Sequence, residues 1–149
     1  MTLVSPLIFL LFQLTTENPL PTKEEDQINP IYQTGQVENG LTLLQKHCYA
    51  CHNPNSDSHD DILAPPLAGV KKHYAKAYPE KEQFSKAMIE FVKNPTVEKS
   101  LMKGPVKRFG LMPKPTATDQ EIQQIVRYIR DVEIARPRWF DEHGKGHGK

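Results

Sequence analysis

The chain has 149 residues, with 19 Lys and Arg against 18 Asp and Glu, a formal net charge of +1 and two cysteines. This near-neutral balance excludes a general electrostatic attraction to nucleic acid or to an anionic membrane surface, and two cysteines exclude a scaffold held by several disulfides. Hydrophobic residues make up only 38% and there are 13 prolines. The composition therefore predicts long irregular segments around a small core.

The N-terminal end is apolar and the C-terminal end is polar. Residues 1–14 carry no charged side chain, but a bilayer-spanning helix needs about 20 apolar residues. We therefore expect residues 1–16 to form a signal peptide or an N-terminal apolar anchor, although no basic residue precedes the stretch. Residues 17–31 are predicted to be a polar linker, residues 32–140 a globular domain, and residues 141–149 a flexible tail of His, Gly and Lys.

Three segments of the globular part predict helices. Apolar residues recur at helical spacing over Thr34–His47 and over Glu80–Lys93. Thr118 and Glu121 have the spacing of a capping box. The helix that starts there would bear Ile122, Ile125, Val126, Ile129 and Val132 on one face. No segment alternates with a period of two, so the sequence predicts an all-α fold.

The segments between these helices contain many turn-forming residues. Residues 64–69 read Ala-Pro-Pro-Leu-Ala-Gly, which is typical of a rigid turn. Residues 96–115 contain Gly-Pro and Met-Pro pairs, and we expect them to be mostly loop.

Both cysteines lie in the motif Cys48-Tyr49-Ala50-Cys51-His52. Cys-x-x-Cys-His is the attachment signature of c-type haem. Two thiols at this spacing can add to the two vinyl groups of one porphyrin, and the adjacent imidazole can then ligate the iron from one face. The motif predicts one covalently bound haem c, with His52 as an iron ligand.

Three other uses of the two cysteines fit the sequence less well. A disulfide across two intervening residues is strained in a helix and would not need His52. A thioredoxin-like redox pair expects a strand–helix setting, which the sequence lacks. A zinc site would need two further ligands, and the available histidines fit no common zinc spacing. These histidines are His47, His52, His59 and His73.

The second axial ligand is predicted to be Met112. This residue lies in a loop between Gly110 and Pro113, and a loop can fold over the far face of the ring, as in the His/Met ligation of cytochromes c. The alternatives are Met102, a His or Lys side chain, or an open site. Met88 lies on the apolar side of a predicted helix and is expected in the core.

The motifs resemble those of class I monohaem c-type cytochromes of bacteria, over residues 34–134. Cys48, Cys51 and His52 match the family's haem attachment and proximal ligand. The turn at 64–69 resembles the family's turn after that motif, which implies that the Pro65 carbonyl accepts a hydrogen bond from the His52 ring. The resemblance implies a cytochrome c fold of three to five helices and Pro-rich loops around one haem.

Two further features bear on this resemblance. Phe109-Gly110-Leu111-Met112-Pro113 is similar to the family's axial-methionine loop, and Gly40 with Tyr128 matches the close crossing of its first and last helices. The sequence departs from the family at Ala64, where Gly is frequent, and in the longer segment between His73 and Pro105.

Residues around the haem can also be suggested. The candidates for its apolar shell are Leu67, Phe84, Phe91, Phe109, Ile125 and Tyr128. Arg108 and Trp139 are candidates for hydrogen bonds to the propionates. The basic residues expected near the haem edge are Lys71, Lys72, Lys76, Lys103, Lys107, Arg108 and Lys114; such residues can steer a redox partner.

The expected function is electron transfer. A haem with two protein ligands leaves no open coordination site, which suits a carrier and not an enzyme. We expect a periplasmic monomer that shuttles electrons between redox partner proteins of a respiratory chain or a periplasmic oxidoreductase. It would touch the membrane only through an uncleaved N-terminal segment. The alternatives are a haem subunit of a larger oxidoreductase, or a sensor or peroxidase with a displaceable sixth ligand.

Overall fold

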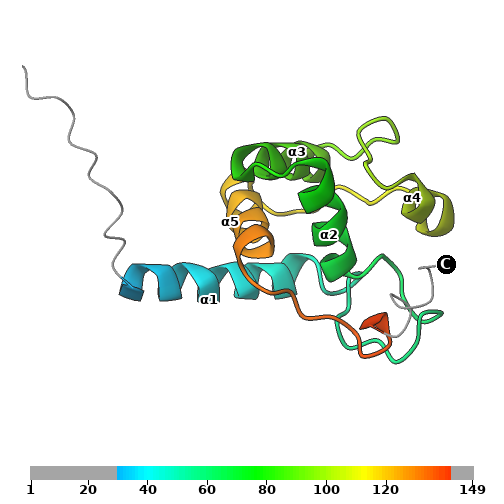
Figure 1. Ribbon diagram of the computed structural model, residues 1–149, viewed down its shortest axis with the longest axis horizontal. Coiled ribbons are helices and arrows are strands. Elements are labelled where there is room, and N and C mark those ends of the chain that lie inside the picture. The colour runs from blue at the N-terminus through cyan, green and yellow to red at the C-terminus, as the bar shows by residue number, and fades with distance from the viewer. Residues whose placement is uncertain (1–29, 142–149) are drawn as a thin grey trace, which may run out of the picture.

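The structure is a computed structural model that describes residues 30–141, with side chains from residue 38 onward. These residues form five helices and no strand, as Figure 1 shows. The helices are α1 (Pro30–His47), α2 (Leu67–Ala77), α3 (Lys81–Lys93), α4 (Lys103–Phe109) and α5 (Asp119–Asp131). The predicted all-α class is confirmed. The predicted export segment, most of the linker and the tail from residue 142 lie outside the described residues.

Helix α5 lies between α1 and α3 (Figure 1). Its buried residues are Ile122, Ile125, Val126 and Ile129, the predicted apolar stripe. Burying an aliphatic side chain of this size contributes about 1.5–3 kcal/mol, so this stripe is a large part of the core. No helix within residues 30–141 is long and apolar enough to cross a membrane.

The predicted capping box starts α5. The Thr118 hydroxyl accepts a hydrogen bond from the Glu121 backbone N–H at 3.2 Å, and the Thr118 N–H donates to Glu121 Oε2 at 2.8 Å. Glu121 Oε1 also lies 3.3 Å from both Lys46 Nζ and His47 Nε2, at the end of α1. One carboxylate thus joins the start of α5 to the end of α1. The helix ends at Asp131, so Val132 is the extended residue after it and not its last member.

Helices α1 and α5 cross where Gly40 meets Tyr128. A Cβ atom on Gly40 would lie 2.7 Å from the Tyr128 Cβ, closer than such atoms approach in proteins. Beside this contact, Asn39 Nδ2 donates a hydrogen bond to Gln124 Oε1 at 2.6 Å. The expected close crossing is therefore present, and it fixes the direction in which α1 delivers the residues that follow it.

Two helices were not predicted. Helix α2 follows the turn at Pro66 and buries only Leu67 and Tyr74, so its sequence shows little apolar periodicity. Helix α4 is seven residues long and lies in the segment expected to be loop. Its Gly104-Pro105 pair occupies the first turn, where proline costs little because that N–H has no helical partner.

Figure 1 shows α4 set apart from the other helices at the end of irregular segments. Gly110, with a φ of 83°, ends α4 in a conformation that favours glycine.

Replacement of Gly40 by alanine tests the helix crossing. The added methyl would push α1 from Tyr128, so we expect Gly40→Ala to lower the free energy of unfolding by about 1–3 kcal/mol. Guanidinium denaturation of the haem-loaded protein measures this value. Gly104→Ala is the matched control, because a Cβ there meets nothing within 4 Å. A Gly40→Ala protein as stable as the unsubstituted one would contradict the crossing.

The Glu121 carboxylate predicts a pH dependence of stability. The pKa of Glu121 is lowered from 4.5 to about 2. The largest effects come from hydrogen bonds with the backbone N–H and the hydroxyl of Thr118, and smaller ones from His47 and Lys46. The folded state favours the ionised form of Glu121. The contribution of this carboxylate to the free energy of unfolding is therefore complete above pH 4.5 and is lost as the pH falls through about 2.

We expect Glu121→Gln to remove this contribution. The stability difference between the unsubstituted protein and this variant should be largest above about pH 5 and should shrink toward pH 2. Chemical denaturation at several pH values measures it, with Glu90→Gln on the exposed side of α3 as control. A difference that stays constant over this range would contradict the assigned role.

Candidate cofactor site

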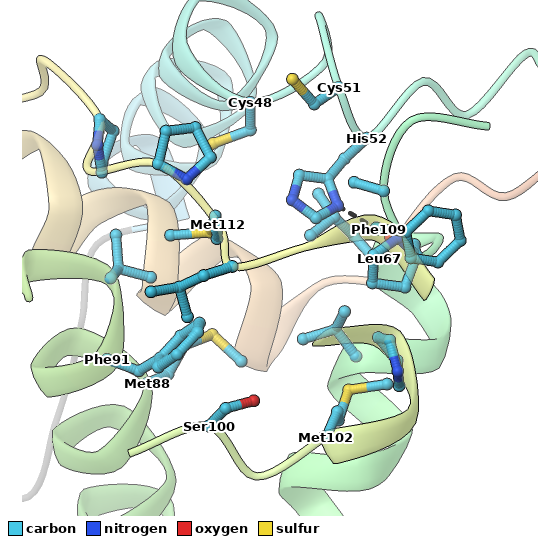
Figure 2. Close-up of a pocket in the computed structure, with 18 of the residues that line it drawn as sticks. Cys48, Cys51, His52, Leu67, Met88, Phe91, Ser100, Met102, Phe109 and Met112 are labelled. Atoms are coloured by element: carbon cyan, nitrogen blue, oxygen red, sulfur yellow. Dashed lines mark hydrogen bonds between the residues drawn. The ribbon is translucent and has the colours of Figure 1, made fainter. Parts of the chain in front are cut away.

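An apolar cavity of about 240 Å³ lies between α2, α3, α5 and the loop that precedes α5. Figure 2 shows the side chains that line it. Its walls are mostly aliphatic, aromatic and proline side chains, including Leu67, Val70, Met88, Phe91, Phe109 and Ile125. The α5 residues of the core are also part of this wall. The cavity therefore suits an apolar group.

The Cys-x-x-Cys-His motif forms one end of the cavity. Helix α1 ends at His47, and the backbone N–H groups of Cys51 and His52 then donate to the Cys48 carbonyl at 3.1 and 2.9 Å. This tight turn brings Cys48, Cys51 and His52 to the same end of the cavity, as Figure 2 shows. The structure does not join the two cysteines in a disulfide. Burial, with a smaller effect from Cys51, raises the pKa of Cys48 to about 11.

The His52 ring is oriented by a backbone carbonyl. Its Nδ1 lies 2.8 Å from the Pro65 oxygen, and because a carbonyl only accepts, Nδ1 carries the proton. The lone pair of the neutral ring is then on Nε2, the nitrogen left to bind a metal. Burial lowers the pKa of His52, and the Pro65 bond offsets part of this effect. The contact is the one that the family resemblance implied.

Three methionines line the cavity. Met112 comes from the loop after α4, Met102 from the residue before α4, and Met88 from α3. Met88 is 3% exposed and belongs to the core, as expected. In Figure 2, Met102 lies beside Ser100 at the end of the cavity away from the cysteines, whereas Met112 lies toward them. Both candidate thioether ligands therefore reach the cavity, from opposite ends of α4.

The predicted apolar shell is partly correct. Leu67, Phe91, Phe109 and Ile125 line the cavity, but Phe84 and Tyr128 do not. Phe84 lies near the start of α3, where its ring meets Tyr74 edge-on with 5.8 Å between ring centroids. Tyr128 faces α1 and covers Gly40. Both aromatic rings serve helix packing.

The two proposed propionate partners have other contacts. The Arg108 guanidinium donates to the His59 carbonyl at 2.9 Å and lies 4.9 Å from the centroid of the Phe109 ring. The indole N–H of Trp139 donates to the Ser56 carbonyl at 3.1 Å. Neither residue lines the cavity. The expectation rested on residue type alone, and the structure assigns both side chains to holding the loop after the motif.

The basic residues expected near the haem edge do not form one group. Lys114 lines the cavity, whereas Lys71 donates to the Val132 carbonyl at 2.7 Å, beyond the end of α5. Lys71 and Lys72 line a separate groove with Glu133 and Arg136. Lys103 donates to the carbonyls of Val97 and Glu98. Of the seven basic residues, Lys114 is the one that lines the cavity.

The side chains of the cavity do not form a zinc site. Within residues 30–141, no three His, Cys, Asp or Glu side chains gather in a way that could hold a metal ion. The cavity offers two thiols, a neutral imidazole and thioethers on an apolar wall. These groups fit an iron porphyrin, which brings four of its own nitrogen ligands.

Sequence reasoning missed one polar group in this wall. Ser100, in the loop between α3 and α4, is 6% exposed and lines the cavity. A lone serine in an irregular segment carries no pattern that marks it as buried. The wider apolar wall could have been anticipated in part, because Ile122 and Ile129 belong to the predicted stripe of α5.

Comparisons with known proteins agree with the geometry. The family model described as Cytochrome c matches residues 37–133. An uncharacterized protein of Aquifex aeolicus (strain VF5) is 27% identical over 129 residues, which cover 76% of this chain and 84% of that protein. No solved structure matches. The match to the family model spans well over half of the chain, including the Cys-x-x-Cys-His motif, and on this basis the chain belongs to the cytochrome c family and carries covalently bound haem c.

Proposed function

We propose that the protein is a single-haem electron carrier whose iron is held by His52 and Met112, with Cys48 and Cys51 forming the thioether bonds. The observation that carries the proposal is that these four side chains line one apolar cavity. The cytochrome c family consists mainly of electron carriers, which agrees with this role. When bound, the haem supplies exchange of one electron between ferrous and ferric iron.

The chain's own residues prepare this site in three ways. The Pro65 carbonyl holds the His52 ring with Nε2 available and makes the imidazole a better donor. Met112 offers a soft thioether that favours the ferrous state. Apolar walls from α2, α3 and α5 exclude water, which also disfavours the more highly charged ferric form. With two protein ligands, oxygen, peroxide and other small molecules find no free position.

We further propose that redox partners dock at the apolar mouth of the cavity. Leu63, Leu101 and Leu111 line the cavity and are nevertheless 69%, 36% and 40% exposed. Exposed leucines around a cofactor site suit a brief contact between two proteins, which needs much less area than a stable complex. Lys114 on the same wall adds a positive charge that a partner's carboxylate can meet.

The location is also a proposal. Covalent haem attachment in bacterial c-type cytochromes takes place outside the cytoplasmic membrane, and residues 1–14 have the uncharged apolar character of an export signal. We therefore propose that the domain acts in the periplasm, free or tethered by its N-terminal segment.

Carbon monoxide binding separates the carrier from a sensor or peroxidase. If Met112 occupies the sixth position, the ferrous protein should bind carbon monoxide slowly or not at all, and the ferric protein should show the sulfur-to-iron charge-transfer band. Visible and near-infrared spectra measure both. Fast carbon monoxide binding without that band would overturn the carrier proposal in favour of a sensor or peroxidase.

Two methionine variants assign the ligand. Met112→Ala should remove the charge-transfer band, lower the reduction potential and open the iron to carbon monoxide. Met102→Ala, which truncates the other loop-borne thioether of the cavity, should leave all three unchanged. The reverse pattern would assign the sixth position to Met102.

A further inference from the structure

Among the described residues, Ser100 is the one polar residue that is buried as a whole, with 6% of its surface exposed. Its backbone N–H is satisfied by the Thr96 and Val97 carbonyls at 3.1 and 3.3 Å, which fixes the residue in the loop between α3 and α4. Within the described residues, the fully buried side-chain atom without a hydrogen-bond partner is Ser56 Oγ, and the Ser100 hydroxyl is not one of these. Ser100 lines the cofactor cavity, so its hydroxyl is placed where a polar atom of a bound group can reach it.

The hydroxyl faces the cofactor cavity. Ser100 lines the cavity together with Leu101 and Met102. Figure 2 shows Ser100 and Met102 at the end of the cavity opposite Cys48 and Cys51. The surroundings at this end are apolar, so a polar atom of the bound group that arrives here finds the Ser100 hydroxyl.

The chemistry of haem determines which atoms reach this end. Its two vinyl groups lie on one pair of adjacent pyrroles and its two propionates on the opposite pair. If Cys48 and Cys51 take the vinyl edge, as proposed above, the propionate edge is directed toward the opposite end of the cavity. We propose that the Ser100 hydroxyl donates a hydrogen bond to a haem propionate.

This assignment replaces the one expected from the sequence. Arg108 and Trp139 bind the carbonyls of His59 and Ser56 and lie outside the cavity wall. A carboxylate against apolar side chains needs a donor, since leaving it unpaired is costly. A hydroxyl donor also reduces the effective negative charge of the propionate carboxylate. Because less negative charge then lies near the iron, Ser100 favours the ferrous state, and its hydrogen bond holds the propionate edge in place.

The other hydroxyl on the cavity wall belongs to Tyr74. Its ring packs in the α2–α3 contact, with ring centroids 5.8 Å from Phe84 and 6.0 Å from Tyr78. Burial raises the pKa of Tyr74 to about 12, with a smaller effect from the neighbouring Tyr78, so this side chain is neutral. Tyr74→Phe removes its hydroxyl and keeps the ring, which makes it the matched control for Ser100→Ala.

The test uses the haem-loaded protein and three variants. Ser100→Ala should shift the propionate bending band in the resonance Raman spectrum and lower the reduction potential, with the sulfur-to-iron charge-transfer band unchanged. Ser100→Thr, which keeps a hydroxyl, and Tyr74→Phe should match the unsubstituted protein. In the unsubstituted protein, exchange into deuterated water should shift the propionate band, a result that needs no variant.

Three outcomes would overturn the proposal. The first is an unchanged propionate band and potential in Ser100→Ala. The second is a change in the charge-transfer band, which would place the hydroxyl on the axial sulfur. The third is a band shift in Tyr74→Phe instead. The mass of the purified protein shows independently whether haem is covalently attached. Absence of attached haem would refute the haem placement on which this inference rests.

Discussion

The structure depends on an apolar wall that serves two purposes. Ile122, Ile125, Val126 and Ile129 pack α5 against its neighbours, and the same residues line the cavity. Protein interiors are normally close-packed by their own side chains. Here the helices instead surround an apolar cavity, so the haem that it holds is part of the core. This explains how a chain with 38% hydrophobic residues forms a folded domain.

The position of the site follows from two contacts between α1 and α5. Gly40 lets α1 cross close to Tyr128, and the Glu121 carboxylate ties the start of α5 to Lys46 and His47. Cys48 comes directly after this clamp. The same contacts that set the helix crossing therefore place the attachment motif at one end of the cavity, where the Pro65 carbonyl orients His52.

The parts of the molecule that were predictable have local signals. The Cys-x-x-Cys-His motif, the capping box at Thr118 and the α5 stripe each lie within a few turns of chain. Helix α2 could not be predicted from apolar periodicity because it buries only two residues. Helix α4 was expected to be loop because its Gly-Pro pair resembles a turn. The roles suggested for Arg108 and Trp139 depended on residue type, whereas tertiary contacts decide them. Ser100 illustrates the same limit, since its burial depends on contacts between distant segments.

If the haem completes the core, the haem-free chain should not hold its fold. Cys48→Ala/Cys51→Ala protein, checked for the absence of haem absorbance, can be followed by circular dichroism during chemical denaturation. We expect loss of helical signal and no cooperative transition, because the cavity wall loses the group that it surrounds. Native-like helicity with a cooperative transition at the denaturant concentration of the haem-loaded protein would contradict it.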